Sequence, residues 1–292
     1  MHLLYITFGK KFSTHLQAAF SICSFLTKKE DILSVNIITD APEYYAHLSN
    51  RVQVRPIASD QLQAWKGPHD FFWRIKIKAI QQLCEEHRGE PILYLDTDTF
   101  LYDRNALKHS FKDDKAIMHE CERAMNNAVT KTEKKMWQQM GSKAFAGSPI
   151  PATARMWNAG VVGVPNTTNG AECRYALQLC DDLCATGVTR RLIEQFSLSV
   201  ALEKYYGLEP AAAFIGHYWS TKEEWEPLIS QVFLEAHFKE APVEVIIQDL
   251  QEFDFLQVPV KKIHKNTSLR LNRLVNKLFG PKLVKYIDST AP

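Results

Sequence analysis

Apolar and polar positions in the N-terminal part of the chain follow a pattern typical of buried strands. Residues 2–8 form a compact apolar run that ends at Gly9, and further strands are predicted over 34–39, 51–57 and 91–94. Short apolar runs that end at turn residues are typical of strands covered on both faces of a sheet. The pattern therefore predicts four strands before residue 100.

Helical periodicity separates these runs. Leu16, Ala19, Phe20 and Cys23 recur at i, i+3, i+4 and i+7 spacing, with Ser13 or Thr14 as the expected N-cap. Further helices are predicted at about 70–87, 130–142, 170–186, 191–206 and 221–240. Strands are predicted over 156–165, broken at Asn158-Ala159-Gly160, and near Gly216-His217. This alternation predicts an α/β fold with an open, mainly parallel sheet.

The last part of the chain differs in charge. Between Leu256 and Ile287 there are eight Lys or Arg residues and no acidic residue. We therefore expect an α/β domain over 1–240 and a helical, basic extension over 241–292. A basic amphipathic helix can lie on an anionic membrane through 261–285, or its leucines can pack as a cap on the preceding domain. Both alternatives remain open from the sequence.

Composition narrows the class of protein. The 292 residues are 46% hydrophobic and 23% charged, which excludes disordered and collagen-like chains. A net charge of +2 is far below that of a general nucleic-acid binder. The six cysteines form no CxxC pair, so we expect buried thiols and no zinc site. No signal peptide or apolar span is seen at the start, so the expected location is the cytoplasm, with peripheral attachment at the inner face of the membrane as one alternative.

Candidate metal chemistry lies at the end of the fourth predicted strand. Four apolar residues, Ile92 to Leu95, lead directly into Asp96 and Asp98. Ligands of open α/β sheets bind beyond the carboxyl ends of strands, and side chains two apart on an extended segment point the same way. Two such carboxylates repel each other unless a cation lies between them, and oxygen ligands suit Mg²⁺ or Mn²⁺. The alternative is a pair of solvated aspartates in a turn, with Asp98 capping the next helix.

A lysine on the apolar face of a predicted helix is the second candidate. On a helical wheel of residues 70–87, Lys76 falls between Phe72, Ala79 and Leu83, and Trp73 lies on the same apolar arc. A buried ammonium requires an anion. The two interpretations are a structural salt bridge with a buried carboxylate and a phosphate contact near the metal.

Five short motifs occur in a characteristic order, namely Arg74-Ile75-Lys76-Ile77, Tyr94-Leu95-Asp96-Thr97-Asp98, Trp157-Asn158-Ala159-Gly160-Val161, Glu194-Gln195 and His217. With them the chain resembles a glycosyltransferase of the GT-A fold. It is most similar to the retaining family 8, which includes glycogenin and bacterial lipooligosaccharide galactosyltransferases. The resemblance spans about residues 2–225 and implies a Rossmann-like sheet and a nucleotide-sugar donor, with UDP as the nucleotide.

The resemblance also implies roles for individual residues. Asp96, Asp98 and His217 would hold Mn²⁺, and the imidazole favours that ion over Mg²⁺. Donor-binding roles fall to Arg74, Lys76, Asn158 and Gly160. Glu194 stands where the family has an Asp that binds sugar hydroxyls, and Gln195 matches the Gln beside the anomeric carbon. The alternative for this last pair is the polar first turn of a helix.

The chain departs from the family at two places. Where the family has a polar pair that touches the base, this chain has Phe8-Gly9, so we expect the base to stack on Phe8. After His217 the family's Gly and Lys-Pro-Trp are replaced by a run in which Lys222 is the candidate diphosphate contact.

Two other functions remain open. A non-catalytic protein that binds sugar nucleotides would retain the same fold. A haloacid-dehalogenase-type phosphatase would use Asp96 as nucleophile and Asp98 as acid/base, although that motif normally opens its domain. The motifs together favour a metal-dependent glycosyltransferase that acts on a saccharide or lipid-linked saccharide.

Overall fold

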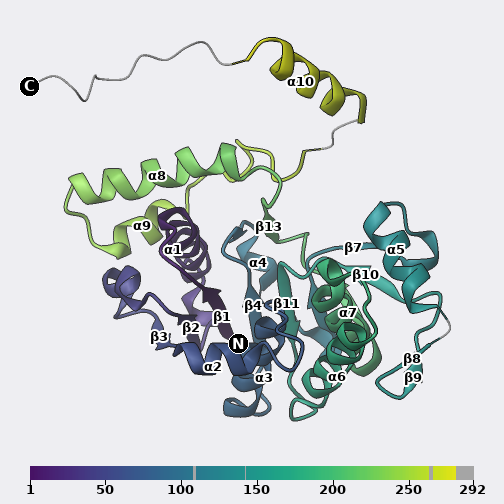
Figure 1. Ribbon diagram of the computed structural model, residues 1–292. Coiled ribbons are helices and arrows are strands. Elements are labelled where there is room, and N and C mark those ends of the chain that lie inside the picture. Colours follow the sequence, from purple (N-terminus) through teal and green to yellow (C-terminus); the bar gives the residue numbers. More distant parts are fainter. Residues whose placement is uncertain (108–109, 142, 263–265, 281–292) are drawn as a thin grey trace, which may run out of the picture.

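The computed structural model describes residues 1–107, 110–141, 143–262 and 266–280. Its centre is a seven-stranded sheet in the order β12-β6-β11-β4-β1-β2-β3 (Figure 1). In chain order these strands are β1 His2–Thr7, β2 Ser34–Thr39, β3 Gln53–Pro56, β4 Ile92–Leu95, β6 Ala116–Met118, β11 Val161–Val164 and β12 Leu208–Pro210. Strand β11 runs antiparallel to both of its neighbours, and all other pairs are parallel. The predicted α/β class with a mainly parallel sheet flanked by helices is confirmed.

Helices cover both faces of this sheet. One face carries α1 (Phe12–Leu26), α8 (Lys222–Phe238) and α9 (Val243–Asp249), and the other carries α3 (Arg74–Glu86), α6 (Ala171–Ala185) and α7 (Ile193–Tyr205). Strand residues alternate between the two cores: Leu3 and Tyr5 pack under α1, whereas Leu4 packs under α3. Because both faces are covered, the central strands β4 and β11 are buried along their whole length, whereas the edge strand β3 carries Gln53 and Arg55.

The remaining elements are short or peripheral. The other helices are α2 Ser59–Trp65, α4 Arg104–Leu107, α5 Lys131–Met140 and α10 Asn266–Leu278, and 3₁₀ turns cover Lys29–Asp31, Pro42–Leu48, Lys112–Asp114, Met125–Asn127 and Arg190–Leu192. Three two-stranded sheets pair β10 (Arg155–Trp157) with β7 (Cys121–Ala124), β13 (Ile215–His217) with β5 (Thr99–Leu101), and β8 (Ala144–Phe145) with β9 (Ser148–Pro149).

Two predicted helix starts are wrong. Helix α1 begins at Phe12 with Lys11 as N-cap, so neither Ser13 nor Thr14 caps it. Helix α3 begins at Arg74 with Trp73 as N-cap, and Asp70, where the helix was predicted to start, adopts a left-handed φ of 45°. Phe72 and Trp73 therefore precede the helix and are 42% and 52% exposed, instead of lying on its apolar face.

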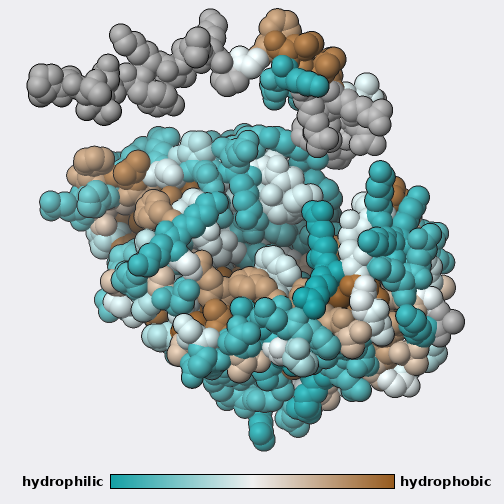
Figure 2. Space-filling view, in the orientation of Figure 1, coloured by the Kyte–Doolittle hydropathy of each residue, from teal (hydrophilic) through white to brown (hydrophobic). Residues whose placement is uncertain are grey.

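The C-terminal part begins on the body of the molecule. Ile246 and Leu250 are buried in the same core as α1, and Phe253 packs against that core. The domain boundary expected at residue 240 stays a prediction. In α10 the apolar side chains Leu271 and Leu274 are 59% and 52% exposed. Figure 2 shows brown and teal atoms on opposite sides of this helix. Among the residues described, no helix combines the length and apolar content needed to cross a bilayer.

Candidate functional site

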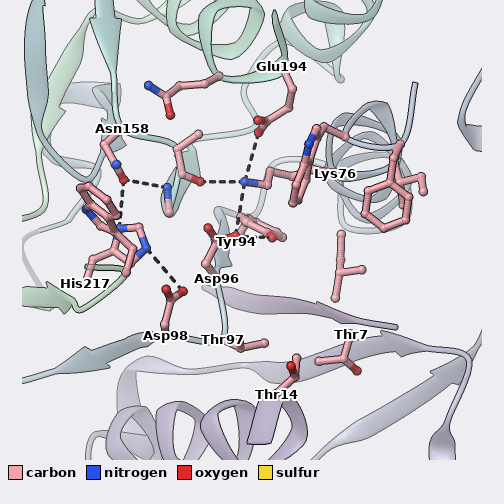
Figure 3. A pocket seen from close by; sticks show the side chains of 18 of the residues that line it. Thr7, Thr14, Lys76, Tyr94, Asp96, Thr97, Asp98, Asn158, Glu194 and His217 are labelled. Carbon is pink, nitrogen blue, oxygen red and sulfur yellow. Dashed lines mark hydrogen bonds and ion pairs between the residues drawn. The ribbon is translucent and has the colours of Figure 1, made fainter. Parts of the chain in front are cut away.

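A cavity of about 470 Å³ opens at the carboxyl ends of β1 and β4 (Figure 3). It is lined by ten of the eleven residues predicted as site residues: Phe8, Lys76, Asp96, Asp98, Asn158, Gly160, Glu194, Gln195, His217 and Lys222. Its size lies within the range of small-molecule binding sites, and its place at the strand ends is where open α/β sheets bind ligands. The predicted residues therefore meet at one site, although they come from distant parts of the sequence.

Strand pairing sets the positions of the two aspartates and the histidine. The Asp96 backbone N–H, directly after β4, donates to the Gly160 carbonyl oxygen at 2.8 Å. Asp98 immediately precedes β5, and β5 pairs with β13 so that Thr99 lies opposite His217. As a result, one ligand atom from each of Asp96, Asp98 and His217 lies within 4.8 Å of the others.

Asp98 is buried among positive groups. Its Oδ1 lies 3.4 Å from Nε2 of His217, and its Oδ2 lies 2.9 Å from Nζ of Lys222. Burial alone would raise the pKa of Asp98, but the hydrogen bond and charge of His217, together with the Lys222 ammonium, bring that pKa well below its usual range. The carboxylate is therefore ionised and available as a ligand at neutral pH.

Lys76 joins two carboxylates from different elements (Figure 3). Its Nζ lies 3.1 Å from Glu194 Oε1 and 3.3 Å from Asp96 Oδ1, and it donates to the Ala159 carbonyl oxygen at 3.1 Å. Burial lowers the pKa of this ammonium, but the two carboxylates outweigh that effect and raise the pKa above its ordinary value. The structure thus has the salt bridge that was one of the two interpretations for Lys76. Burial also raises the pKa of Glu194, in opposition to the Lys76 charge.

The donor set fits a divalent cation. Two carboxylates and one imidazole nitrogen converge at one point, and two carboxylates this close are stabilised by positive charge between them. Oxygen ligands suit Mg²⁺ and Mn²⁺, and the imidazole shifts the preference toward Mn²⁺. Asp96, Asp98 and His217 are the residues that would hold the ion.

Arg74 is the predicted site residue that the structure does not place at the cavity. Its guanidinium donates to both carboxylate oxygens of Asp181 on α6, at 2.8 and 3.0 Å, and to the Trp65 carbonyl oxygen. Because these contacts occupy the Arg74 guanidinium, the structure does not support the predicted role of Arg74 in binding the nucleotide-sugar.

Other predicted residues lie at the walls. Phe8 meets Phe72 edge to face, with ring centroids 5.8 Å apart, and both side chains line the cavity. Glu194 and Gln195 lie in the first turn of α7, which is also where the alternative for this pair, the polar first turn of a helix, placed them. In the described part of the chain, Nε2 of Gln195 is buried without a hydrogen-bond partner. A buried amide donor of this kind is a group that a ligand can satisfy.

The sequence reasoning missed several residues that line the cavity. Arg191 and Trp219 are exposed at its wall, and the Tyr94 hydroxyl donates to Asp96 Oδ1 at 2.6 Å. Arg191 stands three residues before Glu194 and Trp219 two residues after His217, so closeness to the motifs was the available signal. Tyr94 could have been found from the two-residue period of β4, which places it on the same side as Asp96.

No protein-family model matches this chain, and no curated protein matches it. Solved structures similar to it include the galactosyltransferase LgtC in complex with donor and acceptor sugar analogues. That structure is 13% identical, with a TM-score of 0.47 over 72% of this chain and 73% of that chain. An active-site mutant of LgtC is 12% identical, with a TM-score of 0.47 over 72% of each chain.

Proposed function

We propose that this protein is a metal-dependent glycosyltransferase of the GT-A type, a hexosyltransferase that moves a sugar from a nucleotide-sugar to a saccharide or lipid-linked saccharide. The observation that carries the proposal is the convergence of Asp96, Asp98 and His217 in a cavity whose walls also hold Lys76 and Lys222. The family resemblance in the sequence adds UDP as the nucleotide and retention of the anomeric configuration.

The charges around the cavity suit a departing diphosphate. When bound, a divalent cation neutralises the negative charge that develops as the sugar–phosphate bond breaks. Lys222 is half exposed at the cavity wall, so its ammonium can turn from Asp98 toward a phosphate oxygen. Arg191 adds a second cation at the same wall. Both residues would stabilise the leaving group without donating a proton.

The other end of the cavity offers groups for the sugar. Gln195 and Glu194 present an amide and a carboxylate from the first turn of α7. Carbonyl or carboxylate oxygens near an anomeric centre stabilise an oxocarbenium-like species. Lys76 holds Glu194 and Asp96 in place, so in this proposal it orients the sugar-binding carboxylate instead of contacting a phosphate.

An anionic membrane surface is proposed as a further partner, through residues 261–285 and at the inner face of the membrane. The exposed leucines of α10 support this alternative over the cap, because in the described residues they do not pack on the domain. Lys265, Lys282 and Lys285, which belong to the predicted basic segment, lie outside the described residues.

The test is thermal unfolding with Mn²⁺ and a panel of UDP-, GDP-, CMP- and dTDP-sugars. A ligand that binds only the folded state raises the melting temperature by mass action. We expect a Mn²⁺-dependent rise with the UDP-sugars that is lost in Asp98→Asn and retained in Asp249→Asn. Asp249 is exposed at the end of α9 and serves as the matched control.

Turnover then separates the remaining functions. Release of UDP from the donor, dependent on Asp98, supports the transferase. A ligand-dependent rise without any donor cleavage would instead indicate a binding protein. The absence of any rise, together with hydrolysis of a simple phosphate ester, would overturn the proposal in favour of the phosphatase.

A further inference from the structure

The loop between β10 and β11 lies against one of the three residues that would hold the metal. Asn158 Oδ1 accepts a hydrogen bond from the Gly160 backbone N–H at 3.0 Å, and the same oxygen lies 3.0 Å from Nδ1 of His217 (Figure 3). One amide oxygen is thus shared between its own loop and the histidine ring.

The backbone contact determines which way the amide faces. The Gly160 N–H can only donate, so the Asn158 atom that meets it must be the oxygen and not the amide nitrogen. This contact by itself assigns the oxygen and the nitrogen of the Asn158 amide.

This orientation in turn fixes the proton on the histidine. Because Oδ1 of Asn158 only accepts, Nδ1 of His217 must carry the hydrogen. Nε2 is then the nitrogen left to face the cation site, and it lies 3.4 Å from Asp98 Oδ1. Metal-bound histidines are commonly oriented in this way by an acceptor on the second nitrogen.

Packing restricts the ring as well. A Cβ at position 160 would lie 2.1 Å from Cε1 of His217, so the ring occupies space that any side chain there would take. On another side His119 meets the ring edge to face, with centroids 5.2 Å apart. The lack of a side chain at position 160 therefore makes room for the imidazole of His217.

We propose that Asn158 and Gly160 are positioning residues for His217, holding its ring with Nδ1–H on Asn158 Oδ1 and Nε2 directed at Asp98 and the cation site. This rests on the proposed function for the presence of the cation, but the contact between Nδ1–H and Asn158 belongs to the metal-free chain. It gives the Asn-Ala-Gly segment a task in addition to lining the cavity.

Two measurements test the inference separately from the proposed function. The first is ¹⁵N NMR of the His217 ring in metal-free protein at mildly alkaline pH, with the signal identified by its loss in His217→Gln. We expect a hydrogen on Nδ1 in the wild type and in Asn158→Asp, which keeps an acceptor, and its loss in Asn158→Ala. A wild-type ring without a hydrogen on Nδ1 overturns the inference, whatever the enzyme does.

The second measurement is the affinity for Mn²⁺ without nucleotide, from the electron paramagnetic resonance of free Mn²⁺. Loss of a partner that orients a metal ligand typically weakens binding about 10- to 100-fold. We expect that loss in Asn158→Ala and in Gly160→Ala, and unchanged affinity in Gly280→Ala, whose added Cβ meets open space. Equal affinity of the wild type and Asn158→Ala overturns the inference, whereas a wild type that binds no Mn²⁺ overturns the metal site of the proposed function.

Discussion

Buried between two carboxylates, the Lys76 ammonium balances charge that the fold would otherwise leave unpaired. Its place among apolar side chains was readable from helical spacing, and its burial is confirmed, with 7% of the residue exposed. Its partners could not be read in the same way. Glu194 reaches it only because α7 packs beside α3 on the same face of the sheet.

Replacing this lysine tests the balance. Lys76→Met leaves Glu194 buried without its cation, and removal of one partner of a buried ion pair costs about 3 kcal/mol of unfolding free energy. Burial already raises the pKa of Glu194, and loss of Lys76 raises it further. The folded state then binds more protons than the unfolded state between the two pKa values, so stability falls as pH rises through that window.

Urea unfolding at about pH 5 and about pH 8 measures this effect. We expect the deficit of Lys76→Met to be larger at the higher pH and to be partly recovered in Lys76→Met/Glu194→Gln. Lys78→Met is the matched control, because Lys78 lies on the same helix and contacts Gln81 instead of a carboxylate. A deficit that is independent of pH would contradict the argument.

At the scale of elements, periodicity located most helices to within a few residues, but their starts depended on local backbone. The apolar arc predicted for 70–87 included Phe72 and Trp73, whereas both residues precede α3 and are exposed. Both rings now line the cavity. The site therefore gained two aromatic walls from a turn that spacing alone could not show.

Helix α10 yields a prediction of its own. Leu274 and Leu278 are 52% and 67% exposed on a helix within the basic segment, which is unfavourable in water and suited to a lipid interface. We expect the full-length protein to co-sediment with vesicles that contain phosphatidylglycerol and not with pure phosphatidylcholine vesicles. Leu274→Glu/Leu278→Glu should weaken this binding at least about tenfold, since two buried leucines are each worth 1.5–3 kcal/mol.

Leu234→Glu provides the control for that experiment. Leu234 is also a half-exposed leucine, but it lies on α8. Equal loss of binding in this variant, or no vesicle binding by the wild type, would contradict the proposed role of α10. Weaker binding at high salt would show the contribution of the basic side chains.

At the scale of the whole molecule, the sequence predicted the four parallel strands β1 to β4. β1 and β4 are bounded apolar runs, whereas β3 alternates apolar residues with Gln53 and Arg55. Strands β6 and β12 were not predicted, since each has only three residues and carries no readable period. The antiparallel place of β11 between β6 and β4 depends on contacts far apart in sequence. Asp96 and Asp98 could still be identified, because they follow a predicted strand directly. Placing a residue at the carboxyl end of a strand does not require knowing which strands lie beside it.

Packing of the helices and strands decides which of the six cysteine thiols are exposed to solvent. Five of the six cysteines are buried, and Cys121 on β7 is exposed. Burial raises the pKa of Cys23 to about 12, so this thiol is protonated and shielded at neutral pH. Cys184, by contrast, has a lowered pKa through a hydrogen bond with Cys180, but it is 7% exposed.

Accessibility should therefore outweigh acidity in the native protein. With a coloured disulfide reagent at neutral pH we expect one fast-reacting thiol, lost in Cys121→Ser and retained in Cys184→Ser, and six reactive thiols in denaturant. Loss of the fast phase in Cys184→Ser instead would mean that α6 opens to solvent beside α3. Because α3 carries Lys76, such opening would also disturb the ion pair between Lys76 and Glu194. The number of fast-reacting thiols therefore reports on how rigidly α6 packs beside the site.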